Sequence, residues 1–260
     1  MTKFEYHKIV KIEENSPLEN RLYNLFKAAI SDEVSIAHFR KLFTKYDSMD
    51  MHIMMKNGKD IGMSYFMYCK NPEYKKDLYI RLGIGIIKEE RGGSFFPKSL
   101  ILKTMLKARL KYLFTNIYMV AITMNPIVYV ATCKYWKYTY PNPIINTPQN
   151  ILELKNRTLD HFMMNEIEED IIGIPFSMPG IEDAKKKFAD TESDNAFIKY
   201  FATRVNAEET DRGLLTFIPV DFINLFIVVF RKTRTDVMRF INKILEENGI
   251  PIFEEYSPIR

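Results

Sequence analysis

The segment from Arg91 to Leu100 holds the residues of this chain best suited to chemistry, in the order Arg-Gly-Gly-Ser-Phe-Phe-Pro-Lys-Ser-Leu. It joins a strand-like run, 78–87, to a helix-like run, 98–114. A glycine-containing turn between a strand and a helix leaves backbone N–H groups unpaired at the positive end of the helix, and phosphate is the usual occupant of such a site. Arg91 and Lys98 flank the turn with side chains that also suit phosphate. The segment therefore predicts a phosphate-binding turn.

The strand that leads into this turn has one bare face. Because strand side chains alternate, Tyr79, Arg81, Gly83 and Gly85 point to the same side, while the other side is continuously apolar. Two glycines leave that face without side chains over part of its length. Either a neighbouring segment of the chain packs closely there, or a ligand lies along the strand.

The composition favours one soluble α/β protein. Its 260 residues are 47% hydrophobic, which is enough for a large core, and its net charge of +4 is scattered among acidic residues rather than gathered in a basic stripe. We therefore expect no nucleic-acid partner. The N-terminus lacks the apolar core of a signal peptide, and polar residues and a proline interrupt the most apolar late stretch, 214–230. A cytoplasmic protein without a membrane partner is expected.

The sequence predicts neither a disulfide framework nor a metal centre. Cys69 and Cys133 are its two cysteines, and His7, His38 and His161 lie far apart without the spacing of metal ligands. We expect no metal cofactor.

The predicted elements up to about residue 138 are a strand, two helices, a hairpin, a strand, a helix, a strand and a helix. The first helix begins with the capping pattern Ser16-Pro17-Leu18-Glu19, and Asn57-Gly58 forms the turn of the hairpin. Later elements are helices at about 151–170 and 181–204, strands within 214–231 and a closing helix at 233–247.

A second informative segment follows the strand 117–124. It reads Asn125-Pro-Ile-Val-Tyr129-Val-Ala-Thr-Cys-Lys134-Tyr-Trp. With this segment, the turn at Arg91 and the order of elements, the chain resembles the GNAT (Gcn5-related N-acetyltransferase) superfamily over residues 4–138. The resemblance implies a mixed, mostly antiparallel central sheet flanked by helices, in which the fourth and fifth strands splay apart. It also implies a single domain over 1–260, with its core in 4–138 and 210–250 and a helical insertion at about 150–205.

The resemblance also implies acetyl-CoA, or another acyl-CoA, as the cofactor. In this family the loop after the fourth strand holds the pyrophosphate, and the pantetheine arm runs between the splayed strands. Two loop positions that are small in the family are Ser94 and Phe96 here. The positions implied to bind the cofactor are Ile87, Arg91, Gly92, Gly93, Ser94, Phe95, Lys98, Asn125 and Lys134.

For catalysis the resemblance implies a tyrosine that protonates the leaving thiolate. Strict spacing places it at Thr132, and Tyr129 lies one helical turn earlier, so we take Tyr129 as the candidate acid. The alternative is an aromatic residue that braces the helix on the sheet. Tyr79, Arg81 and His52 are candidate substrate contacts, with structural pairing or edge packing as their alternative roles.

The predicted function is transfer of an acetyl group from acetyl-CoA to an amine, in a chain that could also form a homodimer. The alternative is a GNAT-like module without catalysis, in which Phe96 records the loss of cofactor binding and the insertion binds a protein partner. A nucleic-acid protein that uses the lysines after residue 97 is a third hypothesis, which the modest net charge disfavours.

Overall fold

The computed structural model of the chain describes residues 2–71, 74, 76–90, 98–162, 164–174, 186, 194–205, 209 and 211–247. Its elements in chain order are β1 (Thr2–Ile9), α1 (Pro17–Ala29), α2 (Ile36–Leu42), β2 (Ser48–Lys56), β3 (Lys59–Lys70), β4 (Asp77–Ile86), a 3-10 turn (Lys88–Glu90), α3 (Lys98–Lys111), β5 (Asn116–Thr123), α4 (Pro126–Tyr135), α5 (Gln149–Phe162), β6 (Asn165–Glu168), β7 (Ile171–Gly173), α7 (Ala196–Arg204), β8 (Arg212–Pro219) and α8 (Phe222–Glu247).

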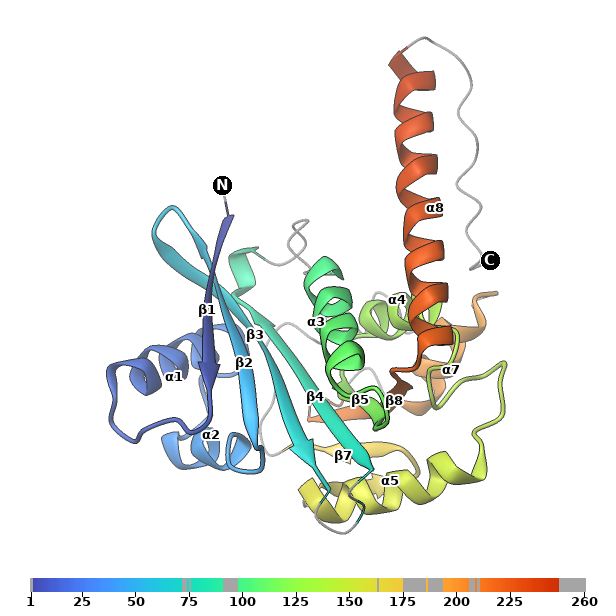
Figure 1. The fold of residues 1–260 in the computed structure, drawn as a ribbon. Helices are drawn as coiled ribbons and strands as arrows, with labels where there is room; N and C mark the ends of the chain where they lie inside the picture. The colour runs from blue at the N-terminus through green and yellow to red at the C-terminus, as the bar shows by residue number, and fades with distance from the viewer. Residues whose placement is uncertain are drawn as a thin grey trace.

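The described strands form a single sheet in the order β1-β2-β3-β4-β5-β8-β7-β6 (Figure 1). Neighbouring strands are antiparallel except for β4 and β5, which are parallel. A parallel pair needs a crossover connection, and α3 lies in that connection here. This mixed, mostly antiparallel sheet with flanking helices confirms the predicted fold class.

The hairpin predicted around Asn57-Gly58 is present and joins β2 to β3. Both residues have positive φ, 52° and 77°, as a two-residue turn of this type requires. The register of this pair shifts once, between Met54 and Met55. The next pairing, of β3 with β4, places Tyr65 directly opposite Gly83 of β4.

The predicted cap of the first helix is also confirmed. The Ser16 hydroxyl accepts a hydrogen bond from the backbone N–H of Glu19 at 3.1 Å, and the Glu19 carboxylate accepts one from the N–H of Asn15 at 2.6 Å. Arg40 of α2 donates to the same carboxylate at 2.7 Å. The cap of α1 therefore also joins α1 to α2.

Helices cover both faces of the sheet. One core contains Phe26 of α1, Phe39 of α2 and Leu154 of α5, packed on the face of β4 that carries its two glycines. A second core contains Met105 of α3 and Leu225 of α8, packed on the apolar face of β4. The two faces of β4 are thus covered by different helices, as its alternating sequence requires.

The region predicted as a helical insertion also adds strands to the sheet. The helix predicted to run to residue 170 ends at Phe162, and β6 and β7 follow as a hairpin whose turn has Asp170 at a φ of 63°. This part of the prediction was wrong because β7 can pair with the edge of β8 and bury Ile171 and Ile172, which overrides local helix propensity. The second predicted helix is represented by α7, and its earlier part lies largely outside the described residues.

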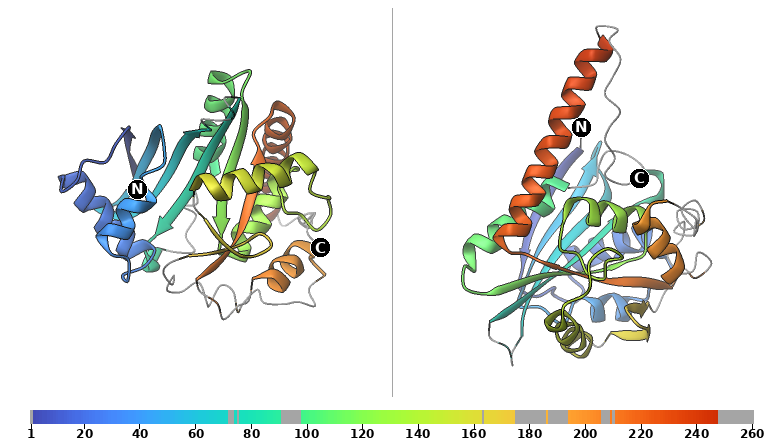
Figure 2. Two further views of the ribbon diagram at one scale, coloured as in Figure 1. Left: turned by 90° about the horizontal axis from the view of Figure 1, so that it is seen from below. Right: turned by 90° about the vertical axis from the view of Figure 1, so that its right-hand side faces the viewer.

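The end of the chain also differs from the prediction of two strands around a bend. After β8 the chain turns at Asp221, whose carboxylate accepts a hydrogen bond from the N–H of Asn224 at 2.7 Å, and α8 begins at Phe222. This cap starts a helix through a stretch of β-branched and aromatic residues whose composition suggests a strand. Beyond its first turns α8 extends away from the body of the molecule (Figures 1 and 2). No helix in the described part of the chain is both long enough and apolar enough to cross a bilayer.

Candidate functional site

The parallel strands β4 and β5 separate partway along their length. Their pairing begins at Asp77 and Asn116 and ends at Arg81 and Val120, although β4 continues to Ile86 and β5 to Thr123. Beyond the last pair no strand pairing joins the described residues of β4 and β5, and we call this unpaired stretch the opening. This is the splay that the resemblance implied between the fourth and fifth strands.

The backbone of β4 presents polar groups to this opening. The N–H of Ile87, directly after β4, donates to the C=O of Ile61 in β3, so the odd-numbered residues of β4 direct their backbone groups toward β3. Backbone direction alternates along a strand, and the N–H and C=O of Ile84 therefore point toward the opening. An extended ligand can pair with such an edge as another strand would.

The backbone of β5 also presents polar groups to the opening, from the side opposite β4. The C=O of Ile117 accepts from the N–H of Val220 next to β8, so the odd-numbered residues of β5 face β8. By the same alternation the N–H of Ile122 faces the opening. The opening is therefore lined by two strand edges with hydrogen-bonding groups.

Tyr65 of β3 lies over β4 at this opening. A Cβ atom placed on Gly83 would meet Cζ of Tyr65 at 2.0 Å and its hydroxyl oxygen at 2.1 Å, so the ring sits directly above that glycine. Gly83 is two residues beyond Arg81, the last β4 residue that pairs with β5. The sequence analysis missed Tyr65, because its place opposite Gly83 depends on the register between β3 and β4.

Arg81 marks the closed end of the opening on the same face as Tyr65. Its guanidinium carbon lies 5.6 Å from the ring centroid of Phe162, and the side chain is half-buried. Burial raises the pKa of Tyr65, and the positive charge of Arg81 opposes that rise. Of the three predicted substrate contacts, Arg81 is the one that the fold brings to the opening.

The bare face predicted for β4 is filled by the protein itself. Tyr65 covers Gly83, and a Cβ on Gly85 would meet Cγ1 of Ile30 at 2.9 Å and Cβ of Ala29 at 3.2 Å in α1. The neighbouring-segment interpretation is thus correct, and a ligand along this face is ruled out by packing. A ligand between β4 and β5 uses the backbone edge instead, which the glycines do not affect.

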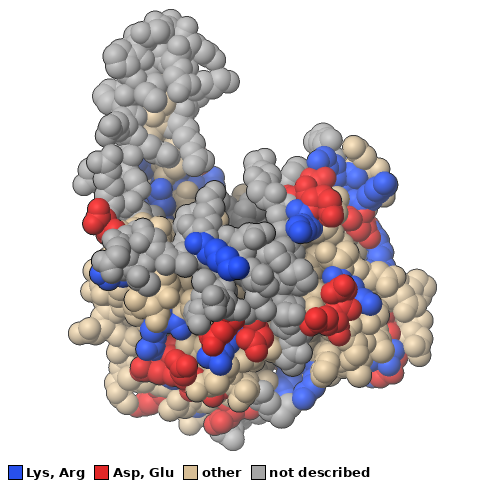
Figure 3. Space-filling model, turned by 180° about the vertical axis from the view of Figure 1, so that it is seen from behind, with Lys and Arg blue, Asp and Glu red and all other residues tan. Residues whose placement is uncertain are grey.

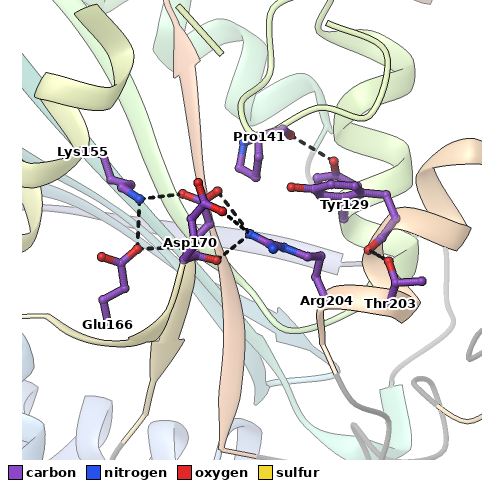
Figure 4. A network of polar contacts seen from close by, with 9 residues as sticks. Tyr129, Pro141, Lys155, Glu166, Asp170, Thr203 and Arg204 are labelled. Carbon is purple, nitrogen blue, oxygen red and sulfur yellow. Dashed lines mark hydrogen bonds and ion pairs between the residues drawn. The ribbon is translucent and has the colours of Figure 1, made fainter. Parts of the chain in front are cut away.

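Tyr129, the predicted acid, is fully buried away from solvent. Its hydroxyl donates to the C=O of Pro141 at 3.0 Å, and its ring lies 6.1 Å from Tyr200 and 5.7 Å from Phe201 of α7, between ring centroids (Figure 4). Burial strongly raises the pKa of Tyr129. Since its one O–H is already donated, the geometry supports the bracing interpretation, and we assign Tyr129 a packing role.

Beside this aromatic cluster, a charged network holds the β6–β7 hairpin between α5 and α7 (Figure 4). Lys155 contacts the carboxylates of Glu166 at 3.0 Å and Asp170 at 3.2 Å, and Arg204 lies 3.8 Å from Asp170. The backbone of Asp170 is also bound, because its N–H donates to Glu166 and its C=O accepts from Leu215. These contacts tie three elements of the insertion together and make it a structural unit.

Two further predicted substrate contacts lie away from the opening. Tyr79 is fully buried at the paired end of the strands, and its hydroxyl accepts from the side chain of Asn71 at 3.3 Å. His52 lies on β2 on the opposite face, with its ring 5.1 Å from that of Tyr6, and burial lowers its pKa. Both side chains therefore lie away from the opening, and their contact with a substrate stays a prediction.

The predicted cofactor residues are only partly within the described chain. The phosphate turn, residues 91–97 with Arg91, Gly92, Gly93, Ser94 and Phe95, lies outside it, and Lys98 begins α3. Ile87 directly follows β4, and its N–H donates to the C=O of Ile61 in β3.

At the other strand, Asn125 caps α4 by accepting from the N–H of Ile127 at 2.9 Å, and Lys134 is half-buried near the end of that helix. The C=O of Lys134 accepts from Arg231 of α8 at 2.8 Å. Asn125 thus has a defined structural role whether or not it also contacts a cofactor. The described residues contain no group of three or more His, Cys, Asp or Glu placed to hold a metal ion.

A pocket of about 570 Å³ lies at the paired end of β4 and β5, away from the opening. In it the guanidinium of Arg157 stacks 4.0 Å from the ring centroid of Tyr74 and lies 3.9 Å from the carboxylate of Asp77. Stacking on Tyr74 and the nearby Asp77 carboxylate give the Arg157 side chain a structural role, so we assign the pocket no part in the site. Its lining is Tyr74, Lys76, Asp77, Asn116, Tyr118, Asn150 and Arg157.

No protein-family model matches the sequence, and no curated protein matches it either. The structure matches several solved acetyltransferases. Naa50 from Arabidopsis thaliana, in complex with a bisubstrate analogue, is 15% identical over 57% of this chain and 92% of that chain, with a TM-score of 0.34. A GNAT family acetyltransferase from Elizabethkingia anophelis with acetyl-CoA bound is 13% identical over 55% and 89%, with a TM-score of 0.33.

A chimera of the spermidine N-acetyltransferase SpeG from Vibrio cholerae and hSSAT is 16% identical over 46% of this chain and 74% of that chain, with a TM-score of 0.30. At these identities and scores we take nothing about activity from the matches. The strand order and the separation of β4 from β5 are what confirm the predicted GNAT-like fold.

Proposed function

We propose that the chain is an acyl-CoA-dependent N-acyltransferase that moves an acetyl group from acetyl-CoA to an amine. The observation that carries this proposal is the opening between β4 and β5. It combines two inward-facing strand edges with a phosphate-type turn that the sequence places between β4 and α3. An extended arm that ends in a thioester and begins with a pyrophosphate matches both features at once.

The proposed division of roles follows the direction of β4. The turn with Arg91, Gly92, Gly93, Ser94 and Phe95, followed by Lys98, binds the pyrophosphate.

From there the pantetheine arm runs back past Ile87 along the edge of Ile84. Asn125 and Lys134, on the β5 side, are proposed as further cofactor contacts. The acetyl group then lies near Arg81, where the strands meet, and Arg81 faces the acceptor.

The chemistry required at that point is mainly positioning. A neutral amine must approach the thioester carbon, and donors near the carbonyl oxygen must stabilise the charge that develops there. The backbone N–H groups that face the opening, those of Ile84 and Ile122, are fixed donors of this kind. The class of amine is set by the surface around Arg81, and its positive charge favours an acceptor with an anionic or neutral environment around the amine.

Two other functions are less well supported. A non-catalytic GNAT-like module would keep the splayed sheet without binding acyl-CoA. A nucleic-acid protein would need a continuous basic surface, whereas basic and acidic side chains are interspersed on the face seen in Figure 3.

The test is calorimetric titration of the purified chain with acetyl-CoA and with CoA. We expect dissociation constants of about micromolar, and weakening by about tenfold or more in Arg91→Glu, since a charged hydrogen bond to phosphate is replaced by repulsion. Lys8→Glu is the matched control, because it reverses an exposed charge on β1 at the far edge of the sheet. Absence of binding at millimolar cofactor would refute the transferase proposal and favour the non-catalytic module.

A further inference from the structure

We propose that the chain forms a dimer in which one face of α8 packs against the same face of α8 in a second copy, with the two helices parallel and in register. This inference does not depend on acyl-CoA binding. It assigns a partner to a surface that the proposed function leaves unused.

α8 carries large apolar side chains that are exposed to solvent along one side. We call the following residues the α8 stripe: Phe222, Ile223, Phe226, Val229, Phe230 and Val237. The three phenylalanines are 55%, 72% and 61% exposed, and Ile223 is 65% exposed. Single exposed apolar residues are normal in soluble proteins, whereas a contiguous patch of them marks an interaction surface.

The α8 stripe faces away from the body of the protein. On the other side of the helix Leu225 and Val228 are buried in the core with α3, and Arg231 donates to the C=O of Lys134 in α4 at 2.8 Å. With about 3.6 residues per turn, these contacts lie about half a turn around the helix from the middle of the stripe. Because α8 also extends beyond the body (Figures 1 and 2), another molecule can reach the stripe.

The spacing along this side of α8 indicates that its partner is another helix. Its positions alternate at intervals of three and four residues, in the order Ile223, Phe226, Phe230, Thr233, Val237 and, further along the sequence, Phe240 and Ile244. Intervals that average about 3.5 residues keep one side of a helix turned toward a partner helix, as in a coiled coil.

A membrane surface fits the same stripe less well. A helix that lies on a bilayer uses basic side chains beside its apolar face to bind anionic headgroups. In α8 the ammonium of Lys232 lies 2.7 Å from the carboxylate of Asp236, and Arg231 is bound to α4. Both of these basic groups are therefore already engaged within the chain.

Two copies of the stripe offer enough area for a stable dimer. A phenylalanine buries about 150–250 Å², so the three in the stripe, at their exposed fractions, present about 400 Å² in each copy. When the aliphatic residues of the stripe are added, two copies can bury about 1,200 Å², the lower end of a standard interface. A surface that pairs with its own copy gives a closed two-fold dimer.

The charges beside the stripe favour a parallel pair in register. In that arrangement Asp236 faces Ile241 of the second copy, and Arg234 faces Val229 of the second copy, so neither meets a like charge. In an antiparallel pair with full overlap, Asp236 would face Asp236 and Arg234 would face Arg234. Since each stripe points away from its own body, the two bodies lie on the outer sides of a parallel pair.

The test is sedimentation equilibrium of the full chain. We expect a wild-type dimer with a dissociation constant of about micromolar, and weakening by about a hundredfold or more in Ile223→Glu, because two carboxylates then face each other between the helices. Ile144→Glu is the matched control, since Ile144 is 67% exposed and lies between α4 and α5. It should keep the wild-type dissociation constant. Phe230→Glu is the second stripe variant and should dissociate the dimer in the same way.

Cysteine cross-linking tests the parallel arrangement. In a parallel pair the two copies of residue 237 face each other, so Val237→Cys should form an interchain disulfide on mild oxidation. Thr235→Cys places the thiol on the other side of the helix and should stay monomeric on a non-reducing gel. A wild-type dimer in which Val237→Cys does not cross-link would overturn the parallel arrangement.

Three results would overturn the dimer itself. One is a wild-type chain that stays monomeric at about 100 µM, well above the expected dissociation constant. Another is a dimer that neither Ile223→Glu nor Phe230→Glu weakens. The third is a monomer that co-sediments with vesicles of phosphatidylserine and phosphatidylcholine, which would make the stripe a membrane surface. Each of these leaves the proposed acyl-CoA binding untouched.

Discussion

Tyr65 and Tyr129 are both buried tyrosines close to the central strands, but they lie in regions of different character. Tyr129 belongs to a closed aromatic cluster between α4 and α7, where Phe201 and Tyr200 cover its ring. The C=O of Pro141 accepts a hydrogen bond from its hydroxyl. Tyr65 lies at an interrupted strand pair, with its ring on Gly83 and its hydroxyl without a described partner. Two tyrosines of similar burial thus differ in whether the described part of the fold uses the hydroxyl.

The largest effect on stability should come from removing the Tyr129 ring from its aromatic cluster. In Tyr129→Ala a large, fully buried ring is removed and a cavity is left between α4 and α7. We expect the free energy of unfolding to fall by about 3–5 kcal/mol, the usual range for such a truncation. Urea denaturation followed by circular dichroism measures this. A loss below about 1 kcal/mol would mean that the cluster is not a packed core.

Adding a methyl group to Gly83, under the Tyr65 ring, should have a smaller effect on stability. In Gly83→Ala the new methyl group would overlap a rigid ring, so we expect a loss of about 1–3 kcal/mol, as for other overpacked positions. Gly85→Ala is the control, since its methyl group meets the side chain of Ile30, which can move more easily. Equal losses in the two variants, measured by the same denaturation, would argue that the Tyr65 ring is free to swing away.

The smallest effects on stability are expected when the hydroxyl of either tyrosine is removed and its ring is kept. Tyr129→Phe leaves the C=O of Pro141 without its buried donor and should lower the free energy of unfolding by about 1 kcal/mol. Tyr65→Phe removes a hydroxyl that has no described partner and should change it by less than about 0.5 kcal/mol. The reverse order in thermal or urea unfolding would contradict the structural role assigned to the Tyr129 hydroxyl.

Local signals in the sequence predicted those parts of the fold that local chemistry determines. The Asn57-Gly58 turn and the Ser16 to Glu19 cap are short patterns in which each residue has one favourable use, and both are present. The β6–β7 hairpin and the start of α8 were missed because a distant sheet edge and the cap at Asp221 decided them. Neither could be read from propensity.

The candidate site shows the same limit. The family resemblance predicted the splay between β4 and β5. The backbone groups along the two strand edges do not depend on which side chains the strands carry. Tyr129 was chosen by motif spacing, which fixes a position along a helix but not what packs against it. Tyr65 was missed because its position depends on pairing with a glycine eighteen residues away, a relation that only the register between β3 and β4 reveals.

The most direct test of the central claim, that the opening between β4 and β5 holds acyl-CoA, is amide hydrogen exchange with and without acetyl-CoA. Exchange slows where a ligand pairs with backbone N–H groups or restricts local opening. We predict slower exchange in peptides that cover Leu82–Ile86 and Ala121–Met124, and unchanged exchange in Ala196–Arg204 of the closed aromatic region. Slower exchange confined to 196–204, with the two strand edges unaffected, would contradict the account.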